Sequence, residues 1–254
     1  MTLAPLAVHA SVRTMIHLGP LALGTVPCIV AAATDRDLAD LGWAALADCI
    51  ELRVDLCADP TPAAAVAACV AAARAGRPLL GTVRWRDEGG GKQLDDAQRR
   101  ALYAAIAPHV AALDVELRSP LCDEIVALAR RHGALAIVSA HFFDATPDAA
   151  ALAALLAEGG RRGDVTKIAA AVHGPADLQR LREVLDAAGP PRIVIGMGAE
   201  AADSRIEFPL HGSLLTYSFA AAPSAPGQLA LPELYDALRA RSPAFAASHP
   251  PRRS

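Results

Sequence analysis

The stretch Gly163-Asp-Val-Thr-Lys-Ile-Ala-Ala-Ala-Val172 is a short apolar run that contains one amine, at Lys167. Its small and β-branched residues are typical of a buried strand in a parallel sheet. The chain has only two lysines, and the other one, Lys92, follows three glycines and is expected in a solvated loop. An amine among apolar neighbours is poorly solvated and attacks carbonyls when free, so Lys167 is a candidate Schiff-base lysine. The alternative is a strand-end lysine that reaches water or pairs with Asp164.

Seven further apolar stretches flank this one, and Ala-rich segments with helical periodicity separate them. The expected strands cover residues 27–33, 49–55, 78–84, 111–117, 134–140, 164–170, 192–196 and 212–217. The expected helices cover residues 61–76, 95–107, 121–132, 147–158, 175–188 and 232–240, with one more starting at Thr34 and a short one near Asp203. A βα unit that recurs about every 30 residues predicts an α/β fold, a single-domain (β/α)8 TIM barrel. A doubly wound sheet is the alternative, but no G-x-G-x-x-G pattern follows the first strand.

No linker divides the chain into separate domains. We expect residues 1–24 to form a leader or a hairpin that closes the barrel, residues 25–245 to form the catalytic barrel, and residues 246–254 to form a disordered tail. Residues 15–33 are nearly uncharged, but glycines and prolines interrupt them. Neither a signal peptide nor a membrane helix is therefore expected.

The composition restricts the class of partner. The 254 residues are 53% hydrophobic and carry a net charge of −3, which argues against nucleic acid or an anionic membrane as the partner. A small anionic substrate needs only a few local arginines. The five cysteines form no C-x-x-C pair and are odd in number, which predicts reduced thiols, no metal site and a cytoplasmic location.

The carboxyl ends of barrel strands meet in one mouth, and polar residues gather at those ends. The residues concerned are Glu51, Arg53, Arg84, Glu88, Asp114, Glu116, His141, Lys167, Arg205, Ser224 and Gln228. This set favours carbonyl chemistry, in which Lys167 forms an iminium, His141 transfers protons and Arg205 holds a carboxylate. A purely structural network, in which Glu51, Asp55, Asp114 and Glu116 close the barrel floor, is the alternative.

Seven stretches, in matching order, resemble type I 3-dehydroquinate dehydratase. They are Glu51-Leu-Arg-Val-Asp55, Thr82-Val-Arg-Trp-Arg-Asp-Glu-Gly-Gly90, His141-Phe-Phe-Asp-Ala-Thr-Pro147, Asp164-Val-Thr-Lys-Ile-Ala169, Met197 through Arg205, His211-Gly-Ser213 and Ser224-Ala-Pro-Gly-Gln228. The resemblance covers residues 27–228. It implies a (β/α)8 barrel that forms a homodimer, uses no metal or cofactor, and converts 3-dehydroquinate to 3-dehydroshikimate.

The resemblance also implies roles for individual residues. Lys167 would be the Schiff-base lysine, His141 the proton-transfer group and Glu88 its helper. Substrate contacts would fall on Glu51, Arg53, Arg84, Arg205, Ser224 and Gln228.

One departure concerns the catalytic histidine: the family has Asp directly after it, whereas this chain has Phe142, with Asp144 two residues further on. An aldolase-type Schiff-base lyase and a non-catalytic quinate or shikimate sensor are the alternative functions. A sensor would be free to lose Lys167, His141 or Glu88, and all three are present.

Overall fold

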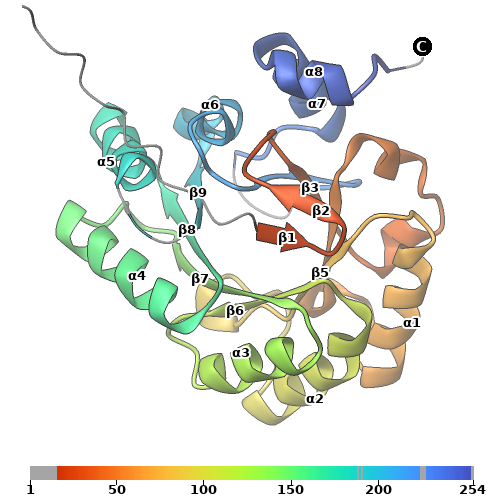
Figure 1. The fold of residues 1–254 in the computed structure, drawn as a ribbon. Helices are drawn as coiled ribbons and strands as arrows, with labels where there is room; N and C mark the ends of the chain where they lie inside the picture. The colour runs from red at the N-terminus through yellow and green to blue at the C-terminus, as the bar shows by residue number, and fades with distance from the viewer. Residues whose placement is uncertain (1–15, 188, 190, 224–226, 253–254) are drawn as a thin grey trace, which may run out of the picture.

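A parallel barrel of eight strands forms the body of the computed structural model, which describes residues 16–187, 189, 191–223 and 227–252 (Figure 1). The barrel strands are β3 (Ile29–Ala33), β4 (Cys49–Arg53), β5 (Leu79–Thr82), β6 (Ala112–Glu116), β7 (Leu135–Phe142), β8 (Val165–Ala171), β9 (Arg192–Met197) and β10 (Thr216–Phe219). Their hydrogen-bonded order is β10-β3-β4-β5-β6-β7-β8-β9. The predicted fold class is confirmed, since each predicted strand contains one barrel strand or overlaps it.

The two ends of the sheet approach each other ahead of β10. The Leu214 N–H donates to the carbonyl oxygen of Arg192 at 3.0 Å. The Ser213 hydroxyl accepts from the Val194 N–H, also at 3.0 Å. These bonds bring the edge of β9 beside the segment that leads into β10, so the barrel is nearly closed.

The helices lie on the outside of the barrel (Figure 1). They are α1 (Pro62–Ala73), α2 (Asp96–Ile106), α3 (Cys122–Arg131), α4 (Ala149–Arg162), α5 (Pro175–Asp186), α6 (Ser204–Leu210), α7 (Leu231–Arg241) and α8 (Pro243–Ser248). One prediction is wrong: the helix expected from Thr34 is replaced by two 3₁₀ helices, Asp35–Leu38 and Gly42–Leu46. The Asp40 side chain accepts the Gly42 N–H at 2.9 Å, and such a local bond competes with a continuous helix.

The amino-terminal end of the barrel is apolar. Strands β1 (Ile16–Leu18) and β2 (Leu21–Leu23) form an antiparallel hairpin, and Gly19 takes the positive φ of +58° that its turn requires. Leu18 and Leu23 belong to a buried cluster with residues from the interior of the strands, among them Val30, Leu80, Ala112, Ile137 and Ile193. The acidic residues therefore do not close the barrel floor, because side chains of this hydrophobic cluster fill it. Residues 1–15 of the expected leader lie outside the described part of the chain.

The carboxyl-terminal segment differs from the expected disordered tail. Helix α8 continues to Ser248, and residues 249–252 follow it along the surface. Phe245 is fully buried and stacks on the His249 ring, whose Nε2 lies 2.8 Å from Asp48 Oδ1. The prediction of disorder is wrong over residues 246–252, because a Pro- and Arg-rich composition does not reveal these anchoring contacts. Residues 253–254 lie outside the described range.

Candidate active site

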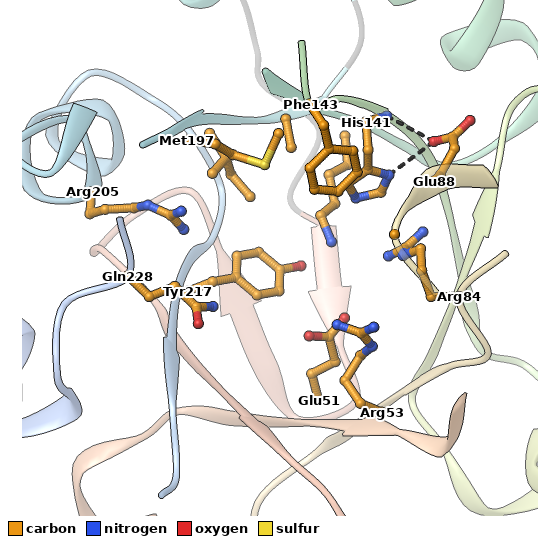
Figure 2. A pocket seen from close by; sticks show the side chains of 14 residues that line it. Glu51, Arg53, Arg84, Glu88, His141, Phe143, Met197, Arg205, Tyr217 and Gln228 are labelled. Atoms are coloured by element: carbon orange, nitrogen blue, oxygen red, sulfur yellow. Dashed lines mark hydrogen bonds and ion pairs between the residues drawn. The ribbon is translucent and has the colours of Figure 1, made fainter. Parts of the chain in front are cut away.

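The carboxyl ends of the strands surround a cavity with about 560 Å³ of empty space, part of it open to solvent (Figure 2). The cavity brings together the predicted residues Glu51, Arg53, Arg84, Glu88, His141, Lys167, Arg205 and Gln228. It is also lined by Gly89, Phe143, Ala169, Ile195, Met197 and Tyr217. The predicted contact Ser224 falls outside the described residues.

Lys167 is buried inside the mouth, with 4% of its surface exposed. It lies on β8 in register with Ser139 of β7, and its Nζ donates to Asp114 Oδ2 at 2.9 Å. The Asp164 carboxylate, one of the two alternatives expected for this lysine, accepts the backbone N–H of Ala136 instead. The amine therefore neither reaches bulk water nor pairs with Asp164.

Asp114 connects the lysine to a buried ion network. Arg84 Nη1 donates to Asp114 Oδ1 at 3.0 Å, to Glu116 Oε1 at 2.7 Å and to Ser139 Oγ at 2.9 Å. Burial by itself would raise the pKa of Asp114, but Arg84 and Lys167 outweigh it and hold that pKa far below its usual range. Asp114 is thus ionised and a poor proton acceptor.

A second pair fixes the loop after β5. Arg53 forms a two-pronged salt bridge with Asp55, at 3.0 and 2.8 Å. The same carboxylate accepts the backbone N–H groups of Arg84 and Gly91, at 3.2 and 3.0 Å. Asp55 therefore has a structural role and holds Arg53 at the cavity. Nearby, Glu51 accepts the Thr82 hydroxyl at 2.8 Å and lines the cavity.

His141 is oriented by Glu88 (Figure 2). Glu88 Oε2 accepts the backbone N–H of His141 at 2.8 Å and lies 3.0 Å from its Nδ1. A carboxylate at Nδ1 favours the tautomer with the proton on that nitrogen, which leaves a lone pair on Nε2. Burial, then Arg84 and Lys167, lowers the pKa of His141 well below its ordinary value. The imidazole is therefore neutral near pH 7 and able to accept a proton.

Arg118 is a residue that the sequence analysis missed. Its Nε donates to Glu88 Oε1 at 2.9 Å and its Nη2 to the His141 carbonyl oxygen at 3.2 Å. The guanidinium also lies over the ring of Phe142, 5.1 Å from the ring centre. Phe142, the departure from the family pattern, therefore packs against Arg118 and does not displace His141. Arg118 follows the fourth barrel strand by two residues, and this position was the feature of the sequence that could have identified it as a site residue.

The opposite side of the mouth is built by β9, β10 and α6. Arg205 lies there with 3% of its surface exposed, and burial lowers its pKa to about 10, against a smaller opposing effect of Tyr217. Tyr217, also missed by the sequence analysis, is buried on β10 with its ring centre 4.3 Å from Lys167 Nζ. The Tyr217 hydroxyl has no hydrogen-bond partner within the described chain. Its place in the predicted strand 212–217 gave the only sequence signal.

Neither a metal cluster nor a membrane-spanning helix is found in the same described ranges. They contain no group of three or more His, Cys, Asp or Glu side chains arranged to hold a metal ion. None of their helices combines the length and the apolar character that a membrane span requires.

Comparisons with known proteins give the family of the chain. The family model of type I 3-dehydroquinase matches residues 26–244. The 3-dehydroquinate dehydratase of Methanocella arvoryzae is 33% identical over 213 residues, which are 84% of this chain and 96% of that protein.

Solved structures of 3-dehydroquinate dehydratases have the same fold. The 3-dehydroquinate dehydratase of Geobacillus kaustophilus superposes with a TM-score of 0.81 at 26% identity, covering 89% of this chain and 95% of that one. The type I enzyme of Clostridium difficile, solved with covalent modified comenic acid, gives 0.80 at 25% identity and covers 92% and 98%. The chain belongs to the type I 3-dehydroquinase family.

Proposed function

We infer that the protein removes water from 3-dehydroquinate to give 3-dehydroshikimate, and that it does so through an imine on Lys167. The observation that carries this inference is the position of the amine, which is buried and faces a cavity shared with His141 and three arginines. The names of the relatives support the substrate. The covalent modified comenic acid in the Clostridium difficile enzyme supports covalent chemistry in this family.

Binding comes first in the proposed sequence. The substrate carboxylate contacts Arg205, whose depressed pKa reflects a buried cation that an anion would stabilise. Arg53 and Glu51 face the same cavity from β4 and are suited to the substrate hydroxyl groups. Holding the carboxylate in this way brings the ketone toward Lys167.

Imine formation requires a lone pair on Lys167 Nζ. The proton that Nζ now donates to Asp114 has to move to a base, and Asp114 already accepts hydrogen bonds from Arg84 and Ser139 in the buried network. His141 is the neutral base in the mouth. Addition of Nζ to the ketone carbon, followed by loss of water, then gives the iminium.

Elimination follows from the electron-withdrawing iminium. His141 Nε2 removes the proton from C2, and the released electron pair moves toward the iminium nitrogen to give an enamine. The enamine pair then forms the C1–C2 double bond as the C1–O bond breaks, and the imidazolium returns its proton to the departing hydroxide. Water finally hydrolyses the iminium, which frees Lys167 and releases 3-dehydroshikimate.

Reductive trapping tests this proposal. Sodium borohydride added with 3-dehydroquinate should leave the reduced adduct on Lys167, located by mass spectrometry of peptides. Lys92, the only other lysine, is the matched control. A Lys92→Ala variant should trap normally, whereas Lys167→Ala should trap nothing and lose more than about 10⁴-fold in kcat/KM. Adduct on any other residue would overturn the assignment.

Two predictions from the sequence concern the protein as a whole. We expect a homodimer in the cytoplasm, as the family resemblance and the reduced cysteines imply. Light scattering coupled to size-exclusion chromatography would measure the mass in solution, and a monomer mass at micromolar concentration would contradict the dimer.

A further inference from the structure

Tyr217 brings into the mouth a hydroxyl group that the proposed reaction sequence does not use. The residue lies on β10, in register with Val30 of β3, and its side chain lines the cavity. In Figure 2 the hydroxyl points toward the centre of the cavity, away from Arg205 and Gln228.

The hydroxyl lacks a hydrogen-bond partner within the part of the chain that the structure describes. Nearby carboxylates are engaged elsewhere: Asp114 with Arg84, Ser139 and Lys167, and Glu51 with Thr82. Burying a hydroxyl that forms no hydrogen bond is unfavourable, and a phenylalanine would fill the same space without that penalty. A polar group kept in such a position is suited to a ligand that supplies the missing partner.

The ring centre of Tyr217 lies 4.3 Å from Lys167 Nζ, so the phenol and the amine face the same part of a bound molecule. We propose that Tyr217 Oη–H donates a hydrogen bond to the carbonyl oxygen of the substrate while Lys167 adds to the carbonyl carbon. This inference rests on the proposed imine chemistry and adds a substrate-contacting residue to it.

The hydrogen bond acts during formation of the carbinolamine. The Nζ lone pair forms the C–N bond, the π electron pair of the carbonyl moves to its oxygen, and a proton from the nitrogen completes the new hydroxyl group. A donor aimed at the oxygen stabilises the negative charge that develops there, and the tyrosine keeps its own proton.

The surroundings of the phenol keep it in the form that donates. Burial raises the pKa of Tyr217 well above its ordinary value, and the carboxylates of Glu51 and Asp114 raise it further. The O–H group therefore remains protonated throughout the neutral range. Arg205, on the same side of the mouth, is the group proposed above for the substrate carboxylate, so the two residues would contact two different parts of one substrate.

The test compares Tyr217→Phe with wild type in time-resolved borohydride trapping. The substitution removes the hydroxyl and retains the ring beside Lys167. We expect adduct on Lys167 to accumulate roughly 10²-fold more slowly, with a similar loss in kcat and a small change in KM, because the lost interaction forms as the carbonyl reacts. Tyr235→Phe is the matched control. Tyr235 lies on α7, outside the mouth, and its hydroxyl donates to the carbonyl oxygen of Pro250, so this variant should trap at the wild-type rate.

The possible outcomes separate the two proposals. Wild type that traps on Lys167, together with Tyr217→Phe that traps equally fast, would overturn the role of Tyr217 and leave the imine intact. Wild type that gives no adduct on Lys167 would overturn both. Slow trapping by Tyr217→Phe, with a midpoint of thermal unfolding that is unchanged or higher, would support the hydrogen bond and exclude a purely structural effect.

Discussion

Arg84 and Arg205 are both buried arginines in the mouth, on opposite sides of it, and their pKa values move in opposite directions. Burial disfavours the charged form of each. For Arg84, Asp114 and Glu116 outweigh burial and raise the pKa well above its usual value. For Arg205, burial prevails and lowers the pKa to about 10. The two arginines thus mark two kinds of wall around one cavity.

The charged wall consists of Arg53, Asp55, Arg84, Glu88, Asp114, Glu116, His141 and Lys167. Ion pairs join Arg53 to Asp55, and join Arg84 and Lys167 to Asp114 and Arg84 to Glu116, while Glu88 holds the neutral His141 through hydrogen bonds. The receiving wall consists of Ile195, Met197, Arg205 and Tyr217, with a buried hydroxyl that lacks a partner in the described chain. The charged wall is organised before substrate arrives. The receiving wall keeps a hydroxyl group that a substrate oxygen would complete. The charged wall should therefore supply the nucleophile and the base, and the receiving wall should hold the carboxylate and the carbonyl oxygen of the substrate.

After the loss of Lys167 itself, the largest effect should come from the histidine of the charged wall. We expect His141→Ala to lower kcat by about 10²–10⁴-fold, because it removes the base for C2 while the nucleophile remains. Borohydride should still trap an adduct on Lys167 in this variant. Normal turnover by His141→Ala would remove the residue from its role and would weaken the contrast between the walls.

Stability tests the charged wall directly. Arg84→Met should destabilise the fold by about 3–5 kcal/mol in urea unfolding, because Asp114 and Glu116 lose their shared cation in a buried site. Arg100→Met is the matched control, since the Arg100–Glu124 pair is about half exposed on both sides and should contribute far less to stability. Equal losses in the two variants would contradict the idea of a tightly coupled wall.

The pH profile reports on the same wall. The pKa of His141 in the folded protein lies below its ordinary value, so the neutral, base-competent form persists as the pH falls through 6.5. The acid limb of kcat/KM should therefore lie below pH 6.5. Folding stability should decline over the same range, since the unfolded chain binds the proton first. An acid limb at or above pH 6.5 would show that the imidazole is not shielded in this way.

The smallest expected effect is a change in folding stability, and it is found by comparing two buried tyrosines. The Tyr103 hydroxyl donates to the Asp114 carbonyl oxygen at 2.7 Å, so Tyr103→Phe should destabilise the fold by about 1–2 kcal/mol. The Tyr217 hydroxyl lacks such a bond within the described residues, so Tyr217→Phe should be neutral or stabilising by up to about 1 kcal/mol. Thermal or urea unfolding measures both. Similar losses would indicate that the Tyr217 hydroxyl is bonded within the protein.

Sequence patterns were sufficient to predict the eight-stranded barrel and most of the residues that line its mouth. Apolar runs mark buried strands, and the residues at their ends converge once the barrel closes, so Lys167, His141 and Arg205 could be predicted to share one cavity. Contacts between side chains on different strands could not be predicted. Asp114 lies 53 residues from Lys167, and Arg118 contacts Glu88 across 30 residues. Such contacts depend on strand register and side-chain direction, which one sequence does not specify.

The predictions that were wrong or incomplete each have a physical cause. The 3₁₀ segment after β3 follows from the Asp40–Gly42 bond, which competes with the helical periodicity seen in the sequence. Residues 246–252 are ordered because Phe245 and His249 dock on distant parts of the chain. Tyr217 was missed because its orphan hydroxyl is recognisable only after all its neighbours are known.

The hairpin β1–β2 and the apolar cluster beside it determine from which end of the barrel small molecules can reach the cavity. Apolar side chains occupy the interior behind Lys167, so the described barrel offers no passage from the cavity to its amino-terminal end. In the reaction that we propose, substrate and product would therefore enter and leave at the carboxyl end of the strands. Water released by the proposed imine formation would stay on that side of the apolar cluster, where the final hydrolysis step needs it.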